Sequence, residues 1–323
     1  MKKKYSNKYL ISTGIGLQDV DHLENSKYFL QESEKYISGE ISLNELKEKI
    51  ANYYKNKPVD KSRTKEADDV STRIADLLSD DSFSFTVGQL LSIHRYLFDG
   101  ILEHPGQLRK YNFTKKEWVL NGDTVTYGDY RELEATLEYD FRVEKEFKYK
   151  GLRINKIIDH LAIFIANLWQ IHAFEEGNTR TIAVFVIKYL RTLGFDVTND
   201  VFEKNAWYFR NALVRANYND FKSGEFEERK YLILFLRNLL LGEKNELKSR
   251  YLHVAYGNRI AEETRENKII SLMRADPSIT IEEIASYIDY SVRTVKTLTK
   301  SLEELKLIRR VGGKKLGYWK VID

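Results

Sequence analysis

The sequence predicts an all-α protein of two or three domains. Its 323 residues are long enough for more than one domain. It contains only 3 prolines and 17 glycines, which favours helices over a turn-rich β fold. Apolar residues recur at helical spacing through much of the chain. The absence of cysteine excludes disulfides and thiolate metal sites, so a reducing cytoplasm is the expected compartment.

The first residues, MKKKYSNKYL, have no apolar stretch behind the lysines, unlike a secretory signal peptide. No apolar run reaches the ~20 residues that a membrane-spanning helix needs. We therefore expect a cytoplasmic protein without a membrane partner. The net charge of +4 lies entirely between Lys268 and Asp323, where eleven basic and seven acidic residues occur. Only this tail is a candidate for binding a polyanion such as DNA.

Short amphipathic helices are predicted in the early part of the chain. The segment EISLNELKEKI has Ser42 placed as an N-cap and Glu45 as its capping-box partner. DDVSTRIADLLSDD repeats the helical pattern, and residues 86–97 predict another helix. Pro58 separates the earliest helices from those that follow.

Residues 117–127, EWVLNGDTVTY, interrupt the helical pattern. β-favouring residues stand on both sides of Asn121-Gly122, and Asn-Gly is the strongest short hairpin signal. We predict an exposed two-stranded hairpin here and call residues 113–128 the flap.

Two apolar segments enclose HAFEEGNTRT, residues 172–181. INKIIDHLAIFIANLWQIH is apolar almost all round, which predicts a helix buried on most sides. TRTIAVFVIKYLRTLGF predicts a second buried helix, with Gly194 just past its end. Two further helices are expected around NAWYFRNALVRANY and ERKYLILFLRNLLLG, and a charged helical linker over residues 243–267.

The stretch between the two buried helices carries groups that suit phosphate chemistry. Gly177 permits a tight turn, and Asn178 can cap a helix that starts near Thr179. The first N–H groups of that helix form an anion site, to which Arg180 can add a bidentate contact. Glu176 would repel a phosphate unless a cation such as Mg²⁺ lies between them.

His172 ends the first buried helix, titrates near neutrality and can take a proton from an attacking hydroxyl. Base, metal ligand and phosphate cradle together compose a phosphoryl- or nucleotidyl-transfer site. Taken singly, each residue also fits a structural role in a turn. Their grouping favours function, because unpaired polar groups between two apolar helices are costly.

The same stretch resembles the signature of the Fic family of nucleotidyl transferases, His-Pro-Phe-x-(Asp/Glu)-Gly-Asn-x-Arg-x-x-Arg between two core helices. The matching positions are His172, Phe174, Glu176, Gly177, Asn178 and Arg180. The resemblance extends to LEHPGQLRKYNF, to the flap and to the helices after the motif, and covers residues 64–242.

This resemblance implies a Fic-type helical core that transfers AMP from ATP to a Ser, Thr or Tyr hydroxyl of a protein, itself included. His172 would be the base, and Glu176 would hold the Mg²⁺ that bridges the phosphates. The backbone amides of Gly177 to Thr179 and the side chains of Asn178 and Arg180 would bind phosphate oxygens.

The flap would hold the target segment as a strand added to its edge. Its docking residues would be Trp118, Val119, Leu120, Asn121 and Gly122. Tyr208 and Asn211, on the next helix, are candidates for the adenine pocket. A surface tyrosine and a helix-end asparagine are the alternative for these two.

Three positions depart from the family pattern or vary within it. Ala173 replaces the usual proline, which loosens the loop slightly. Thr179 stands where the related Doc branch, a kinase, favours lysine, so threonine favours AMP transfer. Ala183 replaces the second arginine, which meets the far phosphate of ATP, so its absence predicts a weaker hold on the nucleotide.

Many Fic proteins are restrained by a helix bearing (Ser/Thr)-x-x-x-Glu, whose glutamate enters the γ-phosphate position. An N-terminal helix of this kind precedes a stretch like YISGEISLNELKEKI, present at residues 36–50. Upstream of it, Ser12 fits the start of the motif, and Gly16 replaces the glutamate, which predicts a de-repressed enzyme. Ser62 and Glu66 form a second-choice register, because they follow that stretch. A plain helix start at Ser12 is the other alternative.

The tail from Lys268 on resembles a winged helix, with a recognition helix over residues 291–305 and a wing over 309–319. The candidate DNA contacts are Arg293, Lys296, Lys300, Lys314 and Lys315. Protein contacts or dimerisation are the alternative use of such a domain, and self-association of the chain stays open.

The predicted domains are a regulatory region (1–63), a Fic core (64–242), a helical linker (243–267) and a winged helix (268–323). Two alternatives to AMP transfer remain. One is Fic-type transfer of another phosphate-containing group, or removal of AMP. The other is a DNA-binding regulator whose degenerate Fic core senses a nucleotide.

Overall fold

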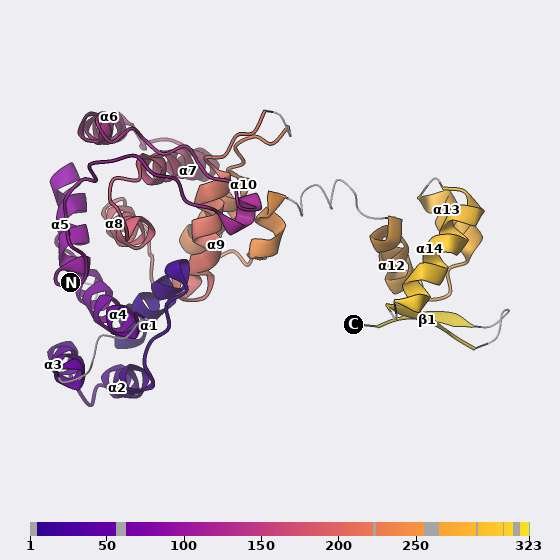
Figure 1. Ribbon diagram of the computed structural model, residues 1–323, viewed down its shortest axis with the longest axis horizontal. Helices are drawn as coiled ribbons and strands as arrows, with labels where there is room; N and C mark the ends of the chain where they lie inside the picture. Colours follow the sequence, from indigo (N-terminus) through magenta and orange to yellow (C-terminus); the bar gives the residue numbers. More distant parts are fainter. Residues whose placement is uncertain are drawn as a thin grey trace. The chain divides into compact units, whose positions relative to one another are not determined.

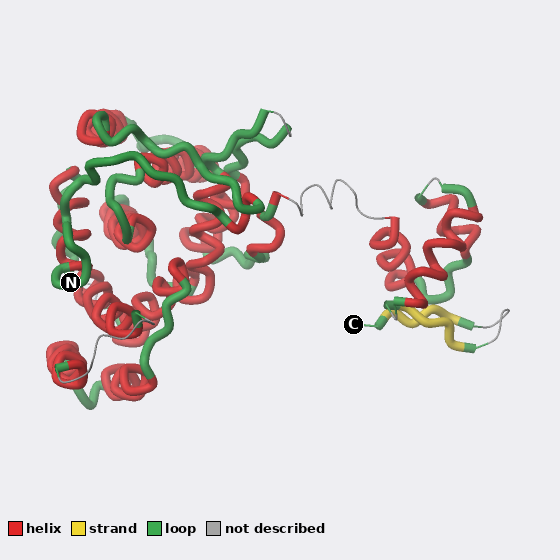
Figure 2. The backbone as a smooth tube through the Cα atoms, in the orientation of Figure 1, coloured by secondary structure: helices red, strands yellow, loops and turns green. Residues whose placement is uncertain are grey.

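The computed structural model describes residues 5–55, 63–221, 224–254, 265–288, 290–305, 307–312 and 317–322 (Figure 1). The chain forms two compact units, Met1–His253 and Val254–Asp323. Helices dominate both, and within the described ranges the strands, yellow in Figure 2, belong to the second unit. The predicted all-α class is confirmed.

Four helices and a 3₁₀ turn open the first unit. They are α1 (Asn7–Gly16), η1 (Leu17–Asp21), α2 (Lys27–Ser38), α3 (Leu43–Tyr54) and α4 (Thr64–Ser79). Ser6, Ser26 and Ser42 cap α1, α2 and α3 by accepting a first-turn N–H. The predicted Ser42–Glu45 capping box is present.

Six further helices complete the core of this unit. They are α5 (Val87–Phe98), α6 (Leu133–Glu146), α7 (Ile154–Ile171), α8 (Asn178–Thr192), α9 (Val201–Arg215) and α10 (Lys230–Leu241). α8 packs on α4, α5 and α7, and Figure 1 shows it inside a ring of other helices. Gly194, just past α8, has the predicted left-handed φ of 89°.

Every residue of α8 from Asn178 to Leu190 is buried. Each fully buried Val, Leu, Ile or Phe contributes about 1.5–3 kcal/mol relative to exposure, so packing fixes this helix firmly. The first turn of α8 is therefore a rigid platform for the residues that precede it.

The N-terminal region packs on this core. α1 contacts α4 and α9, and η1 contacts α8 and α9. Part of the expected linker does the same: Ser249–Leu252 form a 3₁₀ turn, η3, that packs on α9, and Leu252 is buried. Residues 255–264 lie outside the described ranges.

The second unit consists of α12 (Arg265–Ala275), α13 (Ile281–Tyr287), α14 (Val292–Glu304), β1 (Ile308–Val311) and β2 (Tyr318–Val321). The strands pair antiparallel, with Ile308 opposite Val321. Ile269, Val295 and Trp319 belong to its own apolar core. These elements lie where the sequence predicts the helices and wing of a winged helix. None of the helices described in either unit is both long and apolar enough to cross a membrane.

Candidate functional site

His172 begins the motif loop, residues 172–177, directly after α7. It has a left-handed φ of 51°, and its side chain is buried. Neither ring nitrogen has a hydrogen-bond partner among the described residues. Burial, together with the nearby cations Lys115, Arg109 and Arg210, holds the pKa of His172 well below its usual 6.5. The imidazole is therefore neutral near pH 7 and can accept a proton.

Three aromatic rings fix the plane of this imidazole. Tyr127 stacks on it, with ring centroids 3.9 Å apart, and Phe113 and Trp169 meet it edge-on at 5.6 and 5.4 Å. The indole N–H of Trp169 also donates to Thr179 Oγ1 at 3.0 Å. Base, flap and first turn of α8 are thus packed as one group.

Asn178 closes the motif loop on itself. Its Oδ1 accepts from the Phe174 N–H at 3.0 Å, and its Nδ2 donates to the Phe174 carbonyl at 2.7 Å. One expectation needs correction: the Asn178 side chain does not cap α8, whose N-cap is Gly177. Nδ2 carries a second hydrogen beyond the one given to Phe174, so phosphate binding by Asn178 stays a prediction.

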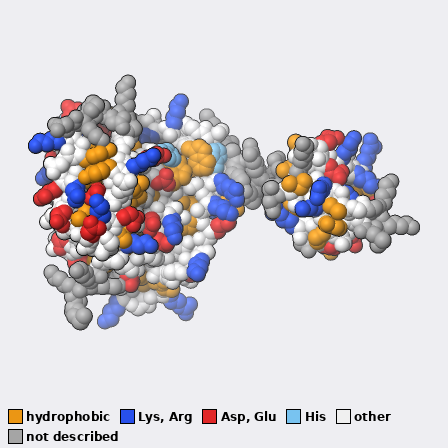
Figure 3. All heavy atoms as spheres, turned by 90° about the horizontal axis from the view of Figure 1, so that it is seen from below, with side chains coloured by type: hydrophobic (Ala, Val, Ile, Leu, Met, Phe, Trp, Pro, Cys, Tyr) orange, Lys and Arg blue, Asp and Glu red, His pale blue; other side chains and the backbone are white. Residues whose placement is uncertain are grey.

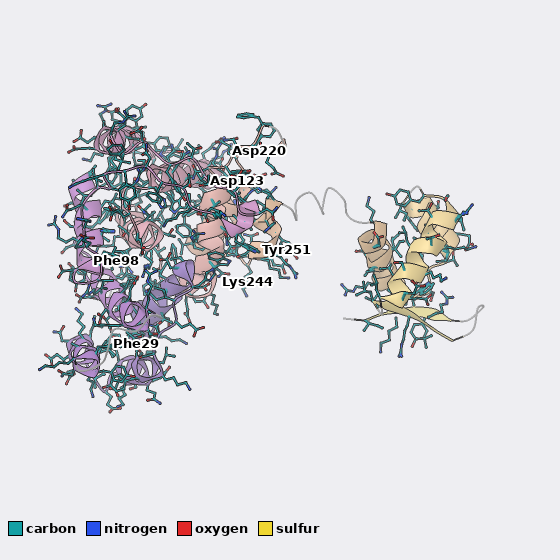
Figure 4. All side chains as sticks on the ribbon, viewed as in Figure 1. Phe29, Phe98, Asp123, Asp220, Lys244 and Tyr251 are labelled. Atoms are coloured by element: carbon teal, nitrogen blue, oxygen red, sulfur yellow. The ribbon has the colours of Figure 1, made fainter. Side chains whose placement is uncertain are left out.

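Gly177 is required where the motif loop enters α8. It has a φ of 74°, and a Cβ there would overlap the ring of Phe98, which Figure 4 labels on α5. The first N–H bonded within α8 is that of Thr181, which donates to the Gly177 carbonyl at 3.0 Å. Within the described part of the chain, the N–H groups of residues 178–180 donate no backbone hydrogen bond, so they could bind an anion.

Arg180 is fully buried among acceptors from the N-terminal part of the chain. Its Nη1 donates to Gln18 Oε1 at 3.0 Å, and its Nη2 lies 2.8 Å from both Asp21 Oδ2 and Glu66 Oε1. Its guanidinium also lies 4.8 Å above the ring of Phe98. Burial alone would raise the pKa of Asp21, but Arg180 and other cations lower it below its usual value. Arg180, which the sequence analysis expects to bind phosphate, is thus paired with two carboxylates.

Glu176 is half-exposed, and its Oε2 lies 3.1 Å from Arg63 Nη2. The described part of the chain contains no cluster of three or more His, Asp or Glu that could hold a metal. Mg²⁺ commonly binds one or two carboxylates together with substrate phosphates and water, so a single glutamate fits that mode. Glu176 could serve as this ligand once Arg63 releases it.

The structure contradicts the assignment of Gly16 to the inhibitory position. Gly16 is buried at the end of α1, and a Cβ there would lie 2.7 Å from the carbonyl carbon of Glu203 on α9. A glutamate side chain has no room at this position. Ser12 lies inside α1, whose N-cap is Ser6, so the alternative of a helix start at Ser12 is also wrong.

The second-choice register, Ser62 and Glu66, places a glutamate next to Arg180 of the Fic-like motif. Glu66 lies in the first turn of α4 and binds Arg180, as described above. It also receives two bonds from Arg63, from Nε to Oε2 and from Nη2 to Oε1, both 2.7 Å. Ser62, the start of this register, lies outside the described residues. A glutamate does reach the motif arginine, from position 66.

The flap forms a loop with one 3₁₀ turn, η2 (Trp118–Leu120), in place of the expected two-stranded hairpin. Asn121 and Gly122 make the predicted turn, with φ values of 56° and 91°. Val119 and Leu120 are buried, contrary to the expected exposed flap. Both residues belong to η2, a 3₁₀ turn, so the segment that carries them is not a strand.

Glu117 anchors the flap to α9. Its fully buried carboxylate accepts two bonds from Arg210, at 2.6 and 3.1 Å, and one from the hydroxyl of Tyr127 at 3.2 Å. Trp118, the next residue, is 47% exposed and lies 6.2 Å from the ring of Trp207. The flap is thus fixed at its base and presents one large apolar side chain.

Arg109 has a structural role that the sequence reasoning missed. Its Nε donates to the His172 carbonyl at 2.7 Å, its Nη1 to the Tyr111 carbonyl at 2.7 Å, and its Nη2 to the Gly128 carbonyl. Its backbone N–H donates to Ala173 at 2.9 Å. A lone arginine in the turn-rich stretch EHPGQLRKYNF is the signal that could have found it.

His94 and Lys115 were also missed. Nδ1 of His94 accepts from the Gly106 N–H at 2.7 Å, so Nε2 carries the proton and donates to the Glu176 carbonyl at 3.0 Å. Its ring stacks on Phe174 at 3.8 Å, and burial lowers its pKa to about 4. Burial likewise lowers the pKa of Lys115, on the flap. No local pattern marks either residue, because their partners are distant in sequence.

Tyr208 and Asn211 are both buried on α9. Tyr208 is therefore not a surface tyrosine, and Asn211 lies inside the helix and not at its end. Tyr208 donates its hydroxyl proton to the Tyr231 carbonyl on α10 at 3.2 Å. Asn211 Nδ2 donates to the Trp207 carbonyl at 2.9 Å, while its buried Oδ1 has no partner in the described part of the structure. Asn211 therefore offers an acceptor that an amino group such as that of adenine could use.

Arg293, Lys296 and Lys300 line one open hollow of ≈ 650 Å³ on α14. Lys296 lies 3.7 Å from Glu282, and Lys300 lies 3.9 Å from Glu304. Figure 3 shows basic side chains on the surface of this unit with acidic ones among them. Lys314 and Lys315 lie outside the described residues.

Fold and site together define a helical domain equipped to hold a phosphate group beside a neutral base. Residues 84–190 match the Fic/DOC family, and they form a Fic domain. This match includes α5, the flap, the motif loop and most of α8.

Two relatives carry the name adenylyltransferase. Protein adenylyltransferase VbhT of Bartonella schoenbuchensis is 24% identical over 153 residues, which are 43% of this chain and 30% of VbhT. "Probable protein adenylyltransferase y4lH" of Sinorhizobium fredii is 25% identical over 149 residues, 46% of this chain and 73% of that protein. The chain thus spans less than a third of VbhT. These names support a transferase at the level of the family.

Solved Fic structures are similar to parts or all of the chain. A Fic family protein from Desulfovibrio desulfuricans G20 has a TM-score of 0.47 at 12% identity, over 98% of this chain and 86% of its own. The N-terminal FIC domain of Bep8 from Bartonella sp. 1-1C has a TM-score of 0.42 at 17% identity, over 60% of this chain and 85% of its own.

Proposed function

We propose that this chain transfers AMP from ATP to a hydroxyl group of a protein, itself included. The observation that carries the proposal is the buried, neutral imidazole of His172, whose two ring nitrogens have no partner among the described residues. Trp169 joins this ring to the first turn of α8, where the N–H groups of residues 178–180 donate no backbone bond within the described chain. A base without a structural bond is free to take a proton, and the open amides can hold phosphate oxygens.

In this reaction His172 takes the proton of the target hydroxyl while the hydroxyl oxygen attacks the α-phosphorus of ATP. A new P–O bond forms, the bond to the oxygen bridging the α and β phosphates breaks, and pyrophosphate leaves with that electron pair. The amides of residues 178–180 and the guanidinium of Arg180 hold the phosphates in line. Mg²⁺, with Glu176 as its protein ligand, would neutralise phosphate charge.

Labelled ATP tests the proposal. Full-length protein with Mg²⁺ and ATP labelled at the α-phosphate should acquire label, and His172→Ala should abolish it. The same protein with γ-labelled ATP should stay unlabelled, since γ-label on protein would indicate a kinase. Absence of both labels, even after the site is opened as described next, would favour another phosphate-containing donor, removal of AMP, or a nucleotide sensor.

We further propose that Glu66 restrains the enzyme. The Glu66 carboxylate is paired with Arg180, and Arg63 is paired with Glu176. Arg180 is therefore not free to bind a nucleotide, and Glu176 is not free to bind a metal. This replaces the expectation of a de-repressed enzyme, which depended on Gly16. Glu66→Ala removes a charged hydrogen-bond partner worth about 1.5–3 kcal/mol, so α-label incorporation should rise about 10- to 100-fold.

The matched control for Glu66→Ala is Asp69→Ala. Asp69 lies one turn later on α4, where it pairs with Lys65. It should leave labelling unchanged. Equal labelling of the Glu66→Ala and unmodified chains would refute the restraint.

The flap is our candidate for docking the protein target. Residues without regular secondary structure precede η2 and follow Gly122, and the half-exposed Trp118 supplies an apolar contact. A target segment could add along this backbone as a strand, which aligns its hydroxyl with His172. Trp118→Ala should weaken labelling of a protein target more than it weakens binding of ATP.

A second candidate function is DNA binding by the C-terminal unit. It is favoured by the single hollow that Arg293, Lys296 and Lys300 share on α14. Duplex DNA should be retarded in a gel with an affinity that falls steeply with salt, and Lys296→Glu should weaken it. Retention of binding by Lys296→Glu combined with Lys300→Glu would favour a protein-contact role.

A further inference from the structure

Position 183 leaves the site one arginine short of the family pattern. Ala183 is fully buried in α8, at the place where a Fic protein has the arginine for the far phosphate. Arg180 is the single arginine in the first two turns of this helix. A second guanidinium for a triphosphate must therefore come from another element.

Arg63 and Arg180 converge on one atom. Arg63 Nη2 lies 2.7 Å from Glu66 Oε1, and Arg180 Nη2 lies 2.8 Å from the same oxygen. Arg63 Nε donates to the other carboxylate oxygen at 2.7 Å. Guanidinium groups bind carboxylate and phosphate with the same two-pronged geometry. Two of them that meet at one carboxylate oxygen are placed to meet at one phosphate oxygen.

The backbone conformation of Arg63 indicates that this residue does more than cap the N-terminus of α4. It stands at the N-cap position with φ 57° and ψ 22°, and its side chain makes no capping bond. A left-handed conformation costs a non-glycine residue about 1–3 kcal/mol. Asn, Ser or Gly would suit this position better. The arginine side chain instead reaches from Glu66 to Glu176 and is 39% exposed, so it has room to move.

We infer that Arg63 is the second phosphate-binding arginine of this site. When Glu66 withdraws, Arg180 keeps its contact with Asp21, and the terminal phosphate of ATP takes the place of the Glu66 carboxylate between Arg180 and Arg63. Arg63 then supplies the contact that Ala183 cannot. It holds the Glu66 carboxylate in the closed arrangement and the phosphate in the nucleotide-bound one. The inference rests on the proposed function in taking ATP as the ligand.

Nucleotide binding without turnover tests this role. The full chain carrying His172→Ala and Glu66→Ala is titrated with ATP and with AMP by calorimetry in the presence of Mg²⁺. Adding Arg63→Ala should weaken ATP binding about 10- to 100-fold, the loss of one charged bidentate contact, and leave AMP binding unchanged. Lys65→Ala is the matched control, because Lys65 pairs with Asp69 outside the site, and it should change neither affinity.

The possible outcomes separate the inference from the proposed function. Unchanged ATP affinity in the Arg63→Ala chain overturns the inference and leaves AMP transfer standing. Equal weakening of ATP and AMP also overturns it, because a general disturbance of the site then explains the loss. If the chain opened by Glu66→Ala binds no ATP, the proposed function and the inference both fall.

Discussion

The imidazole of His172 stacks on the phenol ring of Tyr127, with centroids 3.9 Å apart and planes inclined at 22°. Tyr127 belongs to the flap and donates its hydroxyl proton to Glu117, which is itself paired with Arg210 on α9. His172, the proposed base, therefore packs against the flap, which is proposed to hold the target. A change in the flap would be transmitted to the orientation of His172.

Replacing Tyr127 tests this support. Tyr127→Leu removes the stacked ring, and such aromatic contacts are worth about 0.5–1.5 kcal/mol, so kcat for α-label transfer should fall about 2- to 10-fold. KM for ATP should stay the same, since the phosphates bind elsewhere. Tyr127→Phe keeps the ring and is the control. A kcat that falls equally in both variants would contradict a stacking role.

Two buried neutral histidines predict loss of stability in acid. The pKa of His94 is lowered to about 4 and that of His172 lies well below 6.5, whereas both are ordinary in the unfolded chain. Their contribution is complete above pH 6.5 and is lost as the pH falls toward the folded values, because only the unfolded chain takes up protons there. For His94 the loss should be about 2 kcal/mol at about pH 5.

Urea denaturation between about pH 7 and about pH 5 measures this loss. His94→Gln keeps a donor and an acceptor but removes one titrating group, so its stability should fall less steeply over the same range. Parallel slopes for the two proteins would show that His94 does not titrate as described.

The close approach of α1 to α9 predicts a cost for any side chain at Gly16. Gly16→Ala should destabilise the protein by about 1–3 kcal/mol through overpacking against Glu203. Gly88→Ala is the matched control. Gly88 lies in the first turn of α5, and the nearest atom to a Cβ there is Thr86 Oγ1 at 3.9 Å. It should be neutral or stabilising by up to about 1 kcal/mol. Thermal unfolding of both variants measures the difference, and similar effects would refute the close contact.

The buried pair of Glu117 and Arg210 predicts a larger effect. Arg210→Leu leaves a fully buried carboxylate without its counter-charge, which should cost about 3–5 kcal/mol in the free energy of unfolding. The double variant with Glu117→Leu removes both charges and should recover part of that loss. If the double variant is less stable than Arg210→Leu alone, the pair is not coupled in this way.

The sequence predicts those parts of the site whose residues lie close together along the chain. His172, Glu176 and Arg180 stand within nine residues, and the Ser42–Glu45 capping box spans four. The partners of Arg180 lie elsewhere: Gln18 is 162 positions away and Glu66 is 114. A single sequence holds no local signal for such pairs. The register of Ser12 and Gly16 therefore ranked ahead of Ser62 and Glu66 only because it precedes residues 36–50.

The flap shows a second reason for failure. Its Asn-Gly turn is local and was predicted correctly, but the strands beside it depend on which side chains turn toward the core. Val119 and Leu120 both do so, and tertiary packing overrides the β propensity of the segment. Arg109 and His94 are missed for the same reason, since their partners are backbone groups brought close by folding.

Trp118, Trp169 and Trp207, three of the four tryptophans, lie around the site. Trp169 contacts His172 and bonds to the first turn of α8, while Trp118 is half-exposed on the flap beside Trp207. The emission of these indoles depends on their surroundings. Binding of a nucleotide or of a target segment should therefore change the intrinsic fluorescence of the protein, in real time and without any attached dye.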